Sequence, residues 1–323
     1  MSEGKDNSIF GCLLPPESIS EFFNLMQVMT INGGGKIVAV DYMPGGLTNT
    51  NFVITLDNGQ RAAVRVAGCG TSAYIDRTAE KHNLSLIGNM GVAPEIYFFN
   101  TETGGLISEF IPYATMHPED FIHNNDVLQE AAKSISACHN SGVEFLGRFD
   151  PISKMMAYLE IMKQHNFDKK YVGMDEAISK LDLIKAAYEK NPPHLVPCHN
   201  DTLAENFMYN GETMRIIDWE YSGMNDGFFD IACIIVENPL AEKEEAILLN
   251  AYVGAEPTEL DLAKTLINKF LVTMHWSLWS LVQICNGKDF DFYWEYGRYR
   301  SDFFNRFMAD PNFNRYIELL AEK

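Results

Sequence analysis

The sequence predicts an α+β fold with two lobes: a small antiparallel β lobe with one helix and a larger, mainly helical lobe. Short apolar runs separated by turn signals fill residues 37–111, which is typical of strands. After Pro112 the apolar residues follow the 3.6-residue period of helices. A chain of 323 residues is long enough for two packed lobes. We therefore expect an N-terminal lobe at 1–112 and a C-terminal lobe at 113–323.

The first lobe is predicted to begin with three strands. Apolar segments of strand length occur at 37–43, 52–56 and 62–66. Asp57-Asn58-Gly59 lies between the last two, and it is a strong hairpin signal because Asn and Gly adopt the positive φ of a tight turn. The expected result is three consecutive antiparallel strands.

One helix and two more strands are expected to complete this lobe. The apolar spacing predicts the helix at about 76–87. Two apolar runs, 96–99 and 106–111, flank a Thr103-Gly104-Gly105 turn. The predicted element order is β-β-β-α-β-β.

The second lobe is predicted to be helical except for one island at 197–230. Apolar residues share one face of a helix over 127–141, and Gly142 ends it. Further helices are expected at 242–252, 260–285 and 293–307. A small β lobe joined to a larger helical lobe is expected to leave a cleft for a small molecule.

Charge and hydropathy exclude two kinds of partner. The formal net charge of −19 repels a phosphate backbone, so nucleic acid is not an expected partner. The same charge favours a cationic substrate, although acidity also simply keeps a protein soluble. The most apolar segment, 270–285, contains His275 and Gln283 and is shorter than a membrane-spanning helix, so membrane insertion is not expected.

The cysteine pattern and the N-terminus favour a cytoplasmic protein. The 6 cysteines form no CxxC pair and no small-domain disulfide spacing, which indicates reduced thiols. The N-terminal residues lack the basic and apolar stretches of a secretory signal. The sequence leaves open whether the chain forms a homo-oligomer.

The non-helical island brings three polar side chains together. His199-Asn200-Asp201 is followed by Asn206, which precedes a short strand. A turn at Asn210-Gly211 returns the chain, and a second strand leads to Asp218. In a hairpin with this turn, Asn206 lies across from position 217 or 218. We therefore expect Asn206 and Asp218 to meet next to Asp201.

These side chains suit magnesium and phosphoryl transfer. Amide and carboxylate oxygens are hard ligands, and no His or Cys arrangement suited to zinc accompanies them. Asp201 can orient a substrate hydroxyl and accept its proton. Glu220, two residues beyond Asp218 on the same strand face, can extend the metal shell. An isolated Asp is more often a loop residue or a helix cap, but the combined spacing reverses that preference.

Three motifs in the island carry a family resemblance. HND-x4-N, IIDWEY and FFDIA resemble the catalytic signature of the choline/ethanolamine kinase and aminoglycoside phosphotransferase superfamily. The resemblance implies a protein-kinase-like two-lobe fold, with ATP and Mg2+ as cofactors. It implies Asp201 as the catalytic base and Asn206 and Asp218 as metal ligands. Asp230 would accept hydrogen bonds from backbone donors of the catalytic loop.

The resemblance continues in the first lobe with a phosphate loop. The segment 45–49, GGLTN, lies between the first two strands and matches a phosphate-binding loop of the family. Its backbone N–H groups would lie over the nucleotide phosphates. The expected nucleotide-binding residues of this loop are Gly45, Gly46, Thr48 and Asn49.

Further nucleotide-binding residues follow from the same resemblance. Arg65 takes the place of the protein-kinase lysine, and its guanidinium fork suits phosphate. Glu80, on the next helix, is the expected partner of Arg65. Backbone groups of 108–111, which include Glu109 and Ile111, would bind adenine along a hinge.

The C-terminal helices carry a resemblance that concerns the acceptor. HWSLWSLVQ and FYWEYGRYR resemble a segment of choline kinases. The resemblance implies that Trp276, Trp279 and Tyr296 enclose a trimethylammonium group through cation–π contacts. Tyr221 would close this cage near the metal site. Without that resemblance, aromatic pairs at helical spacing are more often core packing.

The expected function is ATP-dependent phosphorylation of the hydroxyl of choline, a small cationic alcohol, to phosphocholine. A kinase of the same fold for ethanolamine, thiamine or an aminoglycoside is an alternative. A non-catalytic protein that binds a quaternary amine is another, and the intact Asp201, Asn206 and Asp218 argue against it. The sequence does not decide between choline and ethanolamine or between ATP and GTP, and it does not indicate how the product is used.

Overall fold

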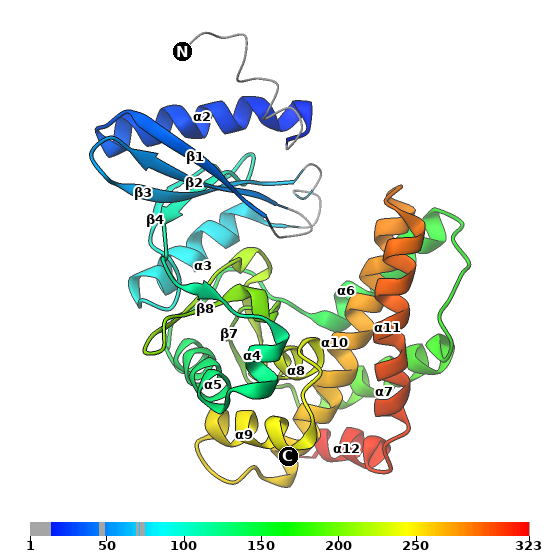
Figure 1. The fold of residues 1–323 in the computed structure, drawn as a ribbon. Coiled ribbons are helices and arrows are strands. Elements are labelled where there is room, and N and C mark those ends of the chain that lie inside the picture. The colour runs from blue at the N-terminus through cyan, green and yellow to red at the C-terminus, as the bar shows by residue number, and fades with distance from the viewer. Residues whose placement is uncertain (1–13, 45–48, 69–70, 72–74, 323) are drawn as a thin grey trace. The chain divides into compact units, whose positions relative to one another are not determined.

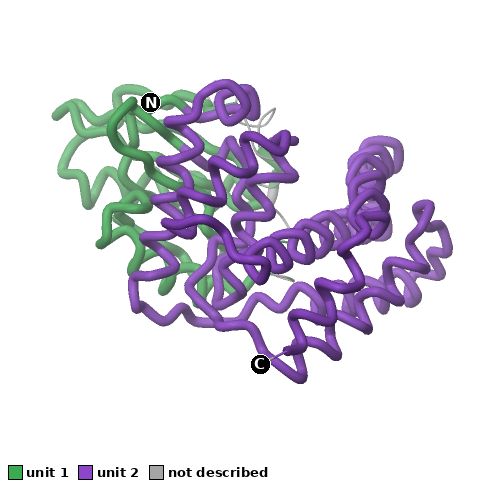
Figure 2. Tube along the Cα trace, turned by 90° about the horizontal axis from the view of Figure 1, so that it is seen from below, with its two compact units in different colours: residues 1–114, 208–221 green, residues 115–207, 222–323 purple. Residues whose placement is uncertain are grey.

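Figure 1 shows the fold of the chain, which forms two compact units, coloured separately in Figure 2. The computed structural model describes residues 14–44, 49–68, 71 and 75–322. Unit 1 contains Met1–Ala114 and Met208–Tyr221, and unit 2 contains Thr115–Phe207 and Ser222–Lys323. Strands and helices both contribute, so the predicted α+β class is confirmed.

Unit 1 is built on a five-stranded antiparallel sheet in the order β1-β2-β3-β5-β4. The strands are β1 (Ile37–Met43), β2 (Thr50–Leu56), β3 (Arg61–Val66), β4 (Ile96–Phe99) and β5 (Leu106–Glu109). The predicted hairpin between β2 and β3 is confirmed. Gly59 has a φ of +85°, and its N–H donates to the Leu56 carbonyl at 3.0 Å. The sheet therefore has the strands that the turn signals predict.

Helix α2 (Pro16–Gly33) packs on this sheet within unit 1 (Figure 1). Phe22, Leu25 and Met29 belong to the same buried cluster as Phe52 and Ile54 of β2. The rings of Phe22 and Phe52 lie 4.8 Å apart. The prediction of one helix in this lobe is wrong, because α2 buries its own apolar face against the sheet in addition to the expected helix.

The expected helix is α3 (Arg77–Asn89), which begins at a capped residue. The Asp76 carboxylate accepts hydrogen bonds from the backbone N–H groups of Thr78 at 2.9 Å and Ala79 at 3.0 Å. Such a cap satisfies donors that a helix start leaves without partners. This cap fixes where α3 begins and therefore where Glu80, in its first turn, is placed.

A hairpin from the island contributes to unit 1. Its strands are β8 (Phe207–Tyr209) and β9 (Met214–Ile216), and the three-stranded sheet that contains them has the order β6-β8-β9, with β6 at Ala114–Thr115. Ile216 N–H donates to the Val92 carbonyl at 2.8 Å. Arg215 Nη1 donates to the Ala93 carbonyl at 3.1 Å. These bonds attach residues 208–221 to unit 1, although the sequence places them in the second lobe.

Unit 2 is mainly helical. Its helices are α4 (Pro118–His123), α5 (Asn125–His139), α6 (Pro151–Gln164), α7 (Met174–Lys190), α8 (Gly227–Glu237), α9 (Glu242–Val253), α10 (Glu259–Cys285), α11 (Phe290–Met308) and α12 (Phe313–Leu320). Strands β7 (Leu195–Cys198) and β10 (Gly223–Asp226) pair antiparallel. The helices predicted over 127–141, 242–252, 260–285 and 293–307 are confirmed within a few residues as α5, α9, α10 and α11.

Helix α10 lies at the centre of unit 2 and contacts α6, α8, α11 and α12. It starts at Thr258 with a capping box, in which Thr258 and Asp261 satisfy each other's backbone N–H groups. Its residues from Phe270 to Gln283 are buried on all sides. None of the helices among the described residues has the length and apolarity that a membrane span requires.

Candidate active site

A buried ion pair between β3 and α3 is central to the site residues in unit 1. Arg65 Nη2 lies 2.6 Å from Glu80 Oε1, and the two side chains are 7% and 0% exposed. The predicted pair is therefore confirmed. Burial acts to lower the pKa of Arg65, but Glu80, Glu220 and Asp218 together raise it above its ordinary value. The guanidinium therefore keeps its positive charge in this buried position.

Asp218 follows β9 in an unusual backbone conformation with a φ of +62°. Its Oδ1 lies 3.7 Å from Arg65 Nη1, and it is buried without a hydrogen-bond partner among the described residues. The pKa of this carboxyl is raised to about 7, because burial and the charge of Glu220 raise it more than Arg65 lowers it. A carboxylate with too little positive charge around it is one that a bound cation would stabilise.

Glu220 is held inside the ion-pair network of unit 1. Its Oε2 accepts from Asn49 Nδ2 at 3.1 Å and lies 3.3 Å from Arg77 Nη1. Arg77 in turn pairs with Glu80 at 2.6 Å. Glu220 thereby joins the predicted phosphate-loop residue Asn49 to α3.

The remaining nucleotide-binding predictions in unit 1 are only partly within the described residues. Gly45, Gly46 and Thr48 lie outside them. Glu109 ends β5, and its Oε2 accepts the backbone N–H of Glu95 at 3.3 Å. Ile111 follows the strand and is buried. The side chains of these two residues are thus packed or hydrogen bonded within unit 1, and the binding of adenine here stays a prediction.

Asp201 and Asn206 lie together in unit 2. Asn206 Nδ2 donates to the backbone carbonyl of Asp201 at 2.8 Å. The Asp201 backbone N–H donates to His199 Nδ1 at 3.2 Å, and Leu203 N–H donates to the Asp201 carbonyl at 3.0 Å. Because Nδ2 makes this bond, the amide oxygen is the Asn206 atom that could serve as a ligand of a metal ion.

Asp230, near the start of α8, holds the loop that carries Asp201. Its Oδ2 accepts the His199 N–H at 2.8 Å, and its Oδ1 accepts the Asn200 N–H at 2.6 Å. The Thr202 hydroxyl donates to the Asp230 carbonyl at 2.7 Å. The predicted interaction of Asp230 with backbone donors of the loop is confirmed.

The predicted aromatic residues of α10 and α11 form one cluster in unit 2. The rings of Trp276 and Trp279 lie 5.6 Å apart at 80°, and those of Trp279 and Tyr296 lie 5.7 Å apart at 58°. Tyr293 packs on Trp279 at 5.7 Å. Each tryptophan is 4% exposed, so little of the aromatic surface of the cluster is accessible.

A buried ion pair beside this cluster was not predicted. The Arg300 guanidinium lies 3.6 Å from the centre of the Tyr296 ring, and its Nε donates to Glu237 Oε1 at 3.0 Å. Arg300 is four residues after Tyr296 on α11, which is the spacing at which helix side chains meet. That spacing is a sequence signal for the contact between Arg300 and Tyr296. No such signal exists for the ion pair, because its other member, Glu237, lies on α8.

The charges around Tyr296 connect the aromatic cluster with the predicted base. Burial raises the pKa of the Tyr296 phenol and Arg300 opposes it, while the carboxylates of Glu237 and Asp201 add to the rise. Asp201 therefore acts electrostatically on the same ring that is predicted to contact the substrate. Within unit 2, the predicted base and the predicted cage share one environment.

Gly297 allows α11 to approach α10 beside the cluster. A Cβ atom at this position would lie 2.1 Å from Ser280 Oγ and 2.2 Å from the Tyr171 hydroxyl. The Tyr171 and Ser280 oxygens are hydrogen bonded at 2.9 Å, and Ser277 Oγ donates to the Gly297 carbonyl at 3.1 Å. The missing side chain is what lets Tyr296 reach Trp279.

The structure thus assembles the predicted residues in two sets. Unit 1 contains Arg65, Glu80, Asp218, Glu220 and Tyr221, and unit 2 contains Asp201, Asn206, Trp276, Trp279 and Tyr296. The expected meeting of Asn206 with Asp218, and of Tyr221 with the cage, stays a prediction.

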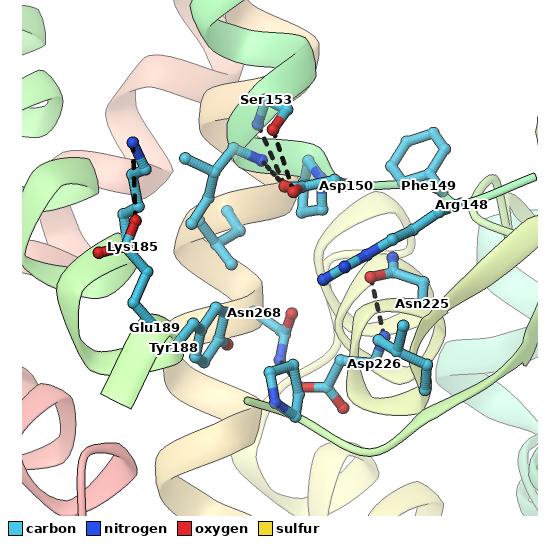
Figure 3. Close-up of a pocket in the computed structure, with 15 residues that line it drawn as sticks. Arg148, Phe149, Asp150, Ser153, Lys185, Tyr188, Glu189, Asn225, Asp226 and Asn268 are labelled. Carbon is cyan, nitrogen blue, oxygen red and sulfur yellow. Dashed lines mark hydrogen bonds and ion pairs between the residues drawn. The ribbon is translucent and has the colours of Figure 1, made fainter. Parts of the chain in front are cut away.

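A separate cavity of about 150 Å³ lies in unit 2 between α6, α7 and α10 (Figure 3). Asn225, Asp226 and Asn268 are buried polar residues in its wall. Asn268 Nδ2 donates to Asp226 Oδ2 at 3.1 Å. The cavity contains none of the site residues that the sequence predicts, so we do not place the reaction there.

Comparisons with known proteins place these residues in a family context. A family model described as choline/ethanolamine kinase matches residues 40–253. Protein LicA of Haemophilus influenzae is 25% identical over 257 residues, which are 77% of this chain and 75% of that protein.

Solved structures of similar proteins cover nearly the whole chain. A choline/ethanolamine kinase family protein from Mesorhizobium loti has a TM-score of 0.80 and 27% identity, over 94% of this chain and 99% of its own. The choline kinase LicA from Streptococcus pneumoniae has a TM-score of 0.72 and 24% identity, over 90% and 98%. These likenesses confirm the predicted kinase-like fold.

Proposed function

The chain belongs to the choline/ethanolamine kinase family, and we propose that it transfers the γ-phosphoryl group of ATP to the hydroxyl of choline. The products are phosphocholine and ADP. The observation that carries the choice of choline is the cluster of Trp276, Trp279 and Tyr296 in the same unit as Asp201. A quaternary ammonium group binds to aromatic faces through cation–π attraction.

Asp201 is proposed as the catalytic base. The choline oxygen attacks the γ-phosphorus in line as the bond from that phosphorus to the β–γ bridging oxygen breaks, and Asp201 accepts the hydroxyl proton. The hydrogen bonds from Asn206 and to His199 hold the Asp201 backbone, so the carboxylate is positioned before the substrate arrives. Positioning and charge neutralisation supply most of the rate enhancement in this chemistry.

Asn206 and Asp218 are proposed to hold Mg2+. The residues fit the ion because Asp218 Oδ1 is buried without a hydrogen-bond donor among the described residues, and because the amide oxygen of Asn206, whose Nδ2 donates to the Asp201 carbonyl, is a hard ligand. When bound, Mg2+ would neutralise charge on the transferring phosphate. Glu220 would support the site through its contacts with Arg77 and Asn49.

Arg65 and Glu80 are proposed to serve the nucleotide. The pair presents a guanidinium whose position is fixed by Glu80 and by the Gly104 carbonyl, which accepts from Nη2 at 3.0 Å. Phosphate oxygens would then bind to the guanidinium and to backbone N–H groups of the 45–49 loop. Backbone groups near Glu109 and Ile111 would pair with adenine.

The chemistry of the cage favours choline over ethanolamine. The primary ammonium of ethanolamine carries three N–H donors that each need an acceptor, whereas a trimethylammonium group has none. The aromatic faces offer no strong acceptor, and the nearby carboxylate Glu237 is already paired with Arg300. Desolvating a primary ammonium there would leave donors unsatisfied.

A substrate panel tests this proposal. ADP release is measured with ATP and Mg2+ in the presence of choline, ethanolamine, thiamine or an aminoglycoside. We expect the highest kcat/KM for choline. Faster turnover of ethanolamine than of choline would identify ethanolamine as the acceptor. Strong turnover of an aminoglycoside with none of choline would refute the proposal. Choline binding without ADP release would favour a non-catalytic binding protein.

A further inference from the structure

Two further side chains extend the hydrogen bonding of the carboxylate that holds the catalytic loop: the buried His139 contacts it directly, and Tyr252 contacts His139. His139, at the end of α5, has Nε2 3.0 Å from Asp230 Oδ2. Its Nδ1 lies 2.9 Å from the hydroxyl of Tyr252, near the end of α9. All three residues belong to unit 2, and the motifs of the sequence single out neither His139 nor Tyr252. The result is a continuous chain of hydrogen bonds from α9 to the loop.

The direction of these hydrogen bonds follows from Asp230. Its Oδ2 already accepts the His199 N–H. A carboxylate oxygen accepts, so His139 Nε2 donates to it, and Nδ1 makes the second hydrogen bond of the ring, with the Tyr252 hydroxyl. Burial raises the pKa of Tyr252, so the phenol keeps its proton. Tyr252 thus fixes the His139 ring, and the ring fixes the Asp230 carboxylate.

The loop that Asp230 supports has a backbone that needs support. Asn200 has a φ of +69°, which is uncommon for a residue with a side chain. The contacts that restrain it include the hydrogen bond from its N–H to Asp230 Oδ1 at 2.6 Å and the hydrogen bond from Asn225 Nδ2 to its Oδ1 at 2.8 Å. Asp201 is the next residue, so a displacement of Asp230 would also displace the catalytic carboxylate.

The start of α8 is shaped around this chain of hydrogen bonds. A Cβ atom on Gly227 would lie 2.5 Å from the Tyr252 hydroxyl and 2.7 Å from His139 Nδ1. The Tyr252 ring also packs edge-on against His139 at 5.6 Å and against Phe228 at 5.5 Å. Close packing therefore restricts the positions of the His139 and Tyr252 side chains. Such restricted side chains are suited to holding Asp230 in place.

We infer that His139 and Tyr252 are positioning residues for phosphoryl transfer, acting through Asp230 to hold Asn200 and Asp201 in the reactive geometry. The inference rests on the proposed function. It assigns no contact with substrate to either residue.

A metal site is the alternative use of this cluster. Ligand atoms of His139, Cys198 and Asp230 lie within 4.8 Å of one another. Both ring nitrogens of His139 already have hydrogen-bond partners. Burial also raises the pKa of the Cys198 thiol, which disfavours the thiolate that a metal needs. The contacts fit a hydrogen-bonded support.

Paired substitutions distinguish positioning from general stability. His139→Leu removes the donor to Asp230, whereas His139→Gln places an amide N–H near the position of Nε2. We expect His139→Leu to lower kcat by about 10- to 100-fold with little change in either KM, because misplaced catalytic groups slow the chemical step. His139→Gln should restore most of kcat, and Tyr252→Phe should lower it by less than His139→Leu does.

Tyr188→Phe is the matched control for Tyr252→Phe. It also removes one buried phenol oxygen, on α7, which carries no predicted site residue. Its kcat should equal that of the wild type. A folded His139→Leu variant with wild-type kcat, or an equal loss in His139→Leu and His139→Gln, would overturn the inference. If His139→Leu does not fold, Tyr252→Phe decides: an unchanged kcat overturns the inference and a lowered kcat at constant KM supports it.

Amide hydrogen exchange separates this inference from the proposed function, because it requires no substrate. In His139→Leu, the His199 and Asn200 amides should exchange faster than in the wild type, while amides of α7 should not change. Equal exchange at His199 and Asn200 would overturn the inference even in an active enzyme. Absence of turnover in the wild type would refute the proposed function. The exchange experiment would still test whether His139 supports the loop. Binding of zinc to the wild type but not to His139→Gln would favour the metal site and would overturn the inference.

Discussion

Asp218→Asn isolates the charge of the proposed metal ligand. The substitution removes one carboxylate and keeps nearly the same shape, and Asn tolerates the φ of +62° that this position requires. Arg65 pairs with Glu80 at 2.6 Å, and this pair does not involve Asp218, so we expect the variant to keep it. Changes in stability can therefore be assigned to the charge of Asp218.

The magnitude follows from the pKa of Asp218, which is raised from 3.8 to about 7. A raised folded-state pKa means that folding favours the protonated form. The stability that protonated Asp218 contributes to the folded state is fully present below pH 3.8, and it is lost as the pH rises through about 7. At about 1.36 kcal/mol per unit, the loss has an upper limit of about 4 kcal/mol. Because the side chain is 31% exposed, solvent screening reduces this, and we expect about 1–4 kcal/mol.

The assay is the free energy of unfolding in urea with EDTA, at pH 5 and pH 8. Asp218→Asn should be more stable than the wild type at pH 8, and the gain should be clearly smaller at pH 5. Mg2+ should stabilise the wild type at pH 8 and should not stabilise the variant. Asp182→Asn, an exposed carboxylate on α7, is the control and should show neither effect. An equal gain at both pH values, or none, would refute the proposed burial of an uncompensated charge.

Three further substitutions probe the nucleotide, the acceptor and the packing. Arg65→Lys loses the fork that contacts Glu80, and initial rates should show an ATP KM raised by about 10-fold; an unchanged KM would contradict the role of Arg65. Trp279→Leu should raise the choline KM by about 10- to 30-fold with kcat nearly unchanged, because it removes a cation–π face; a loss confined to kcat would argue against the cage. Gly297→Ala should lower the free energy of unfolding in urea by about 1–3 kcal/mol, because its Cβ would clash with Ser280 Oγ. An unchanged free energy of unfolding in Gly297→Ala would show that α11 can move away from α10 at no cost.

Local signals predicted the parts of the fold whose causes are local. The Asp57-Asn58-Gly59 turn fixed the β2–β3 hairpin because its residues determine the backbone angles. The Arg65–Glu80 pair was predicted from a motif and the position of the next helix. Helix α2 was missed although Phe22, Leu25 and Met29 have helical spacing, because its partner surface is the sheet that follows it in the chain.

Contacts between distant segments account for what the sequence did not predict. His139 and Asp230 are 91 residues apart in the sequence, and Arg300 and Glu237 are 63 apart. The spacing of the residues therefore predicts neither pair. The raised pKa of Asp218 also depends on burial by packed elements. A motif names such residues, but only the folded chain shows which groups surround them.

The measurement that tests the central proposal most directly is Mg2+-dependent ADP release from ATP with choline, compared between the wild type and Asp201→Asn. We expect turnover of about 1–100 per second for the wild type and a loss of about 100- to 10,000-fold for Asp201→Asn. Choline affinity, measured by calorimetry, should be nearly the same in both. ADP release by Asp201→Asn at the wild-type rate, or choline binding by the wild type without any ADP release, would contradict the proposal.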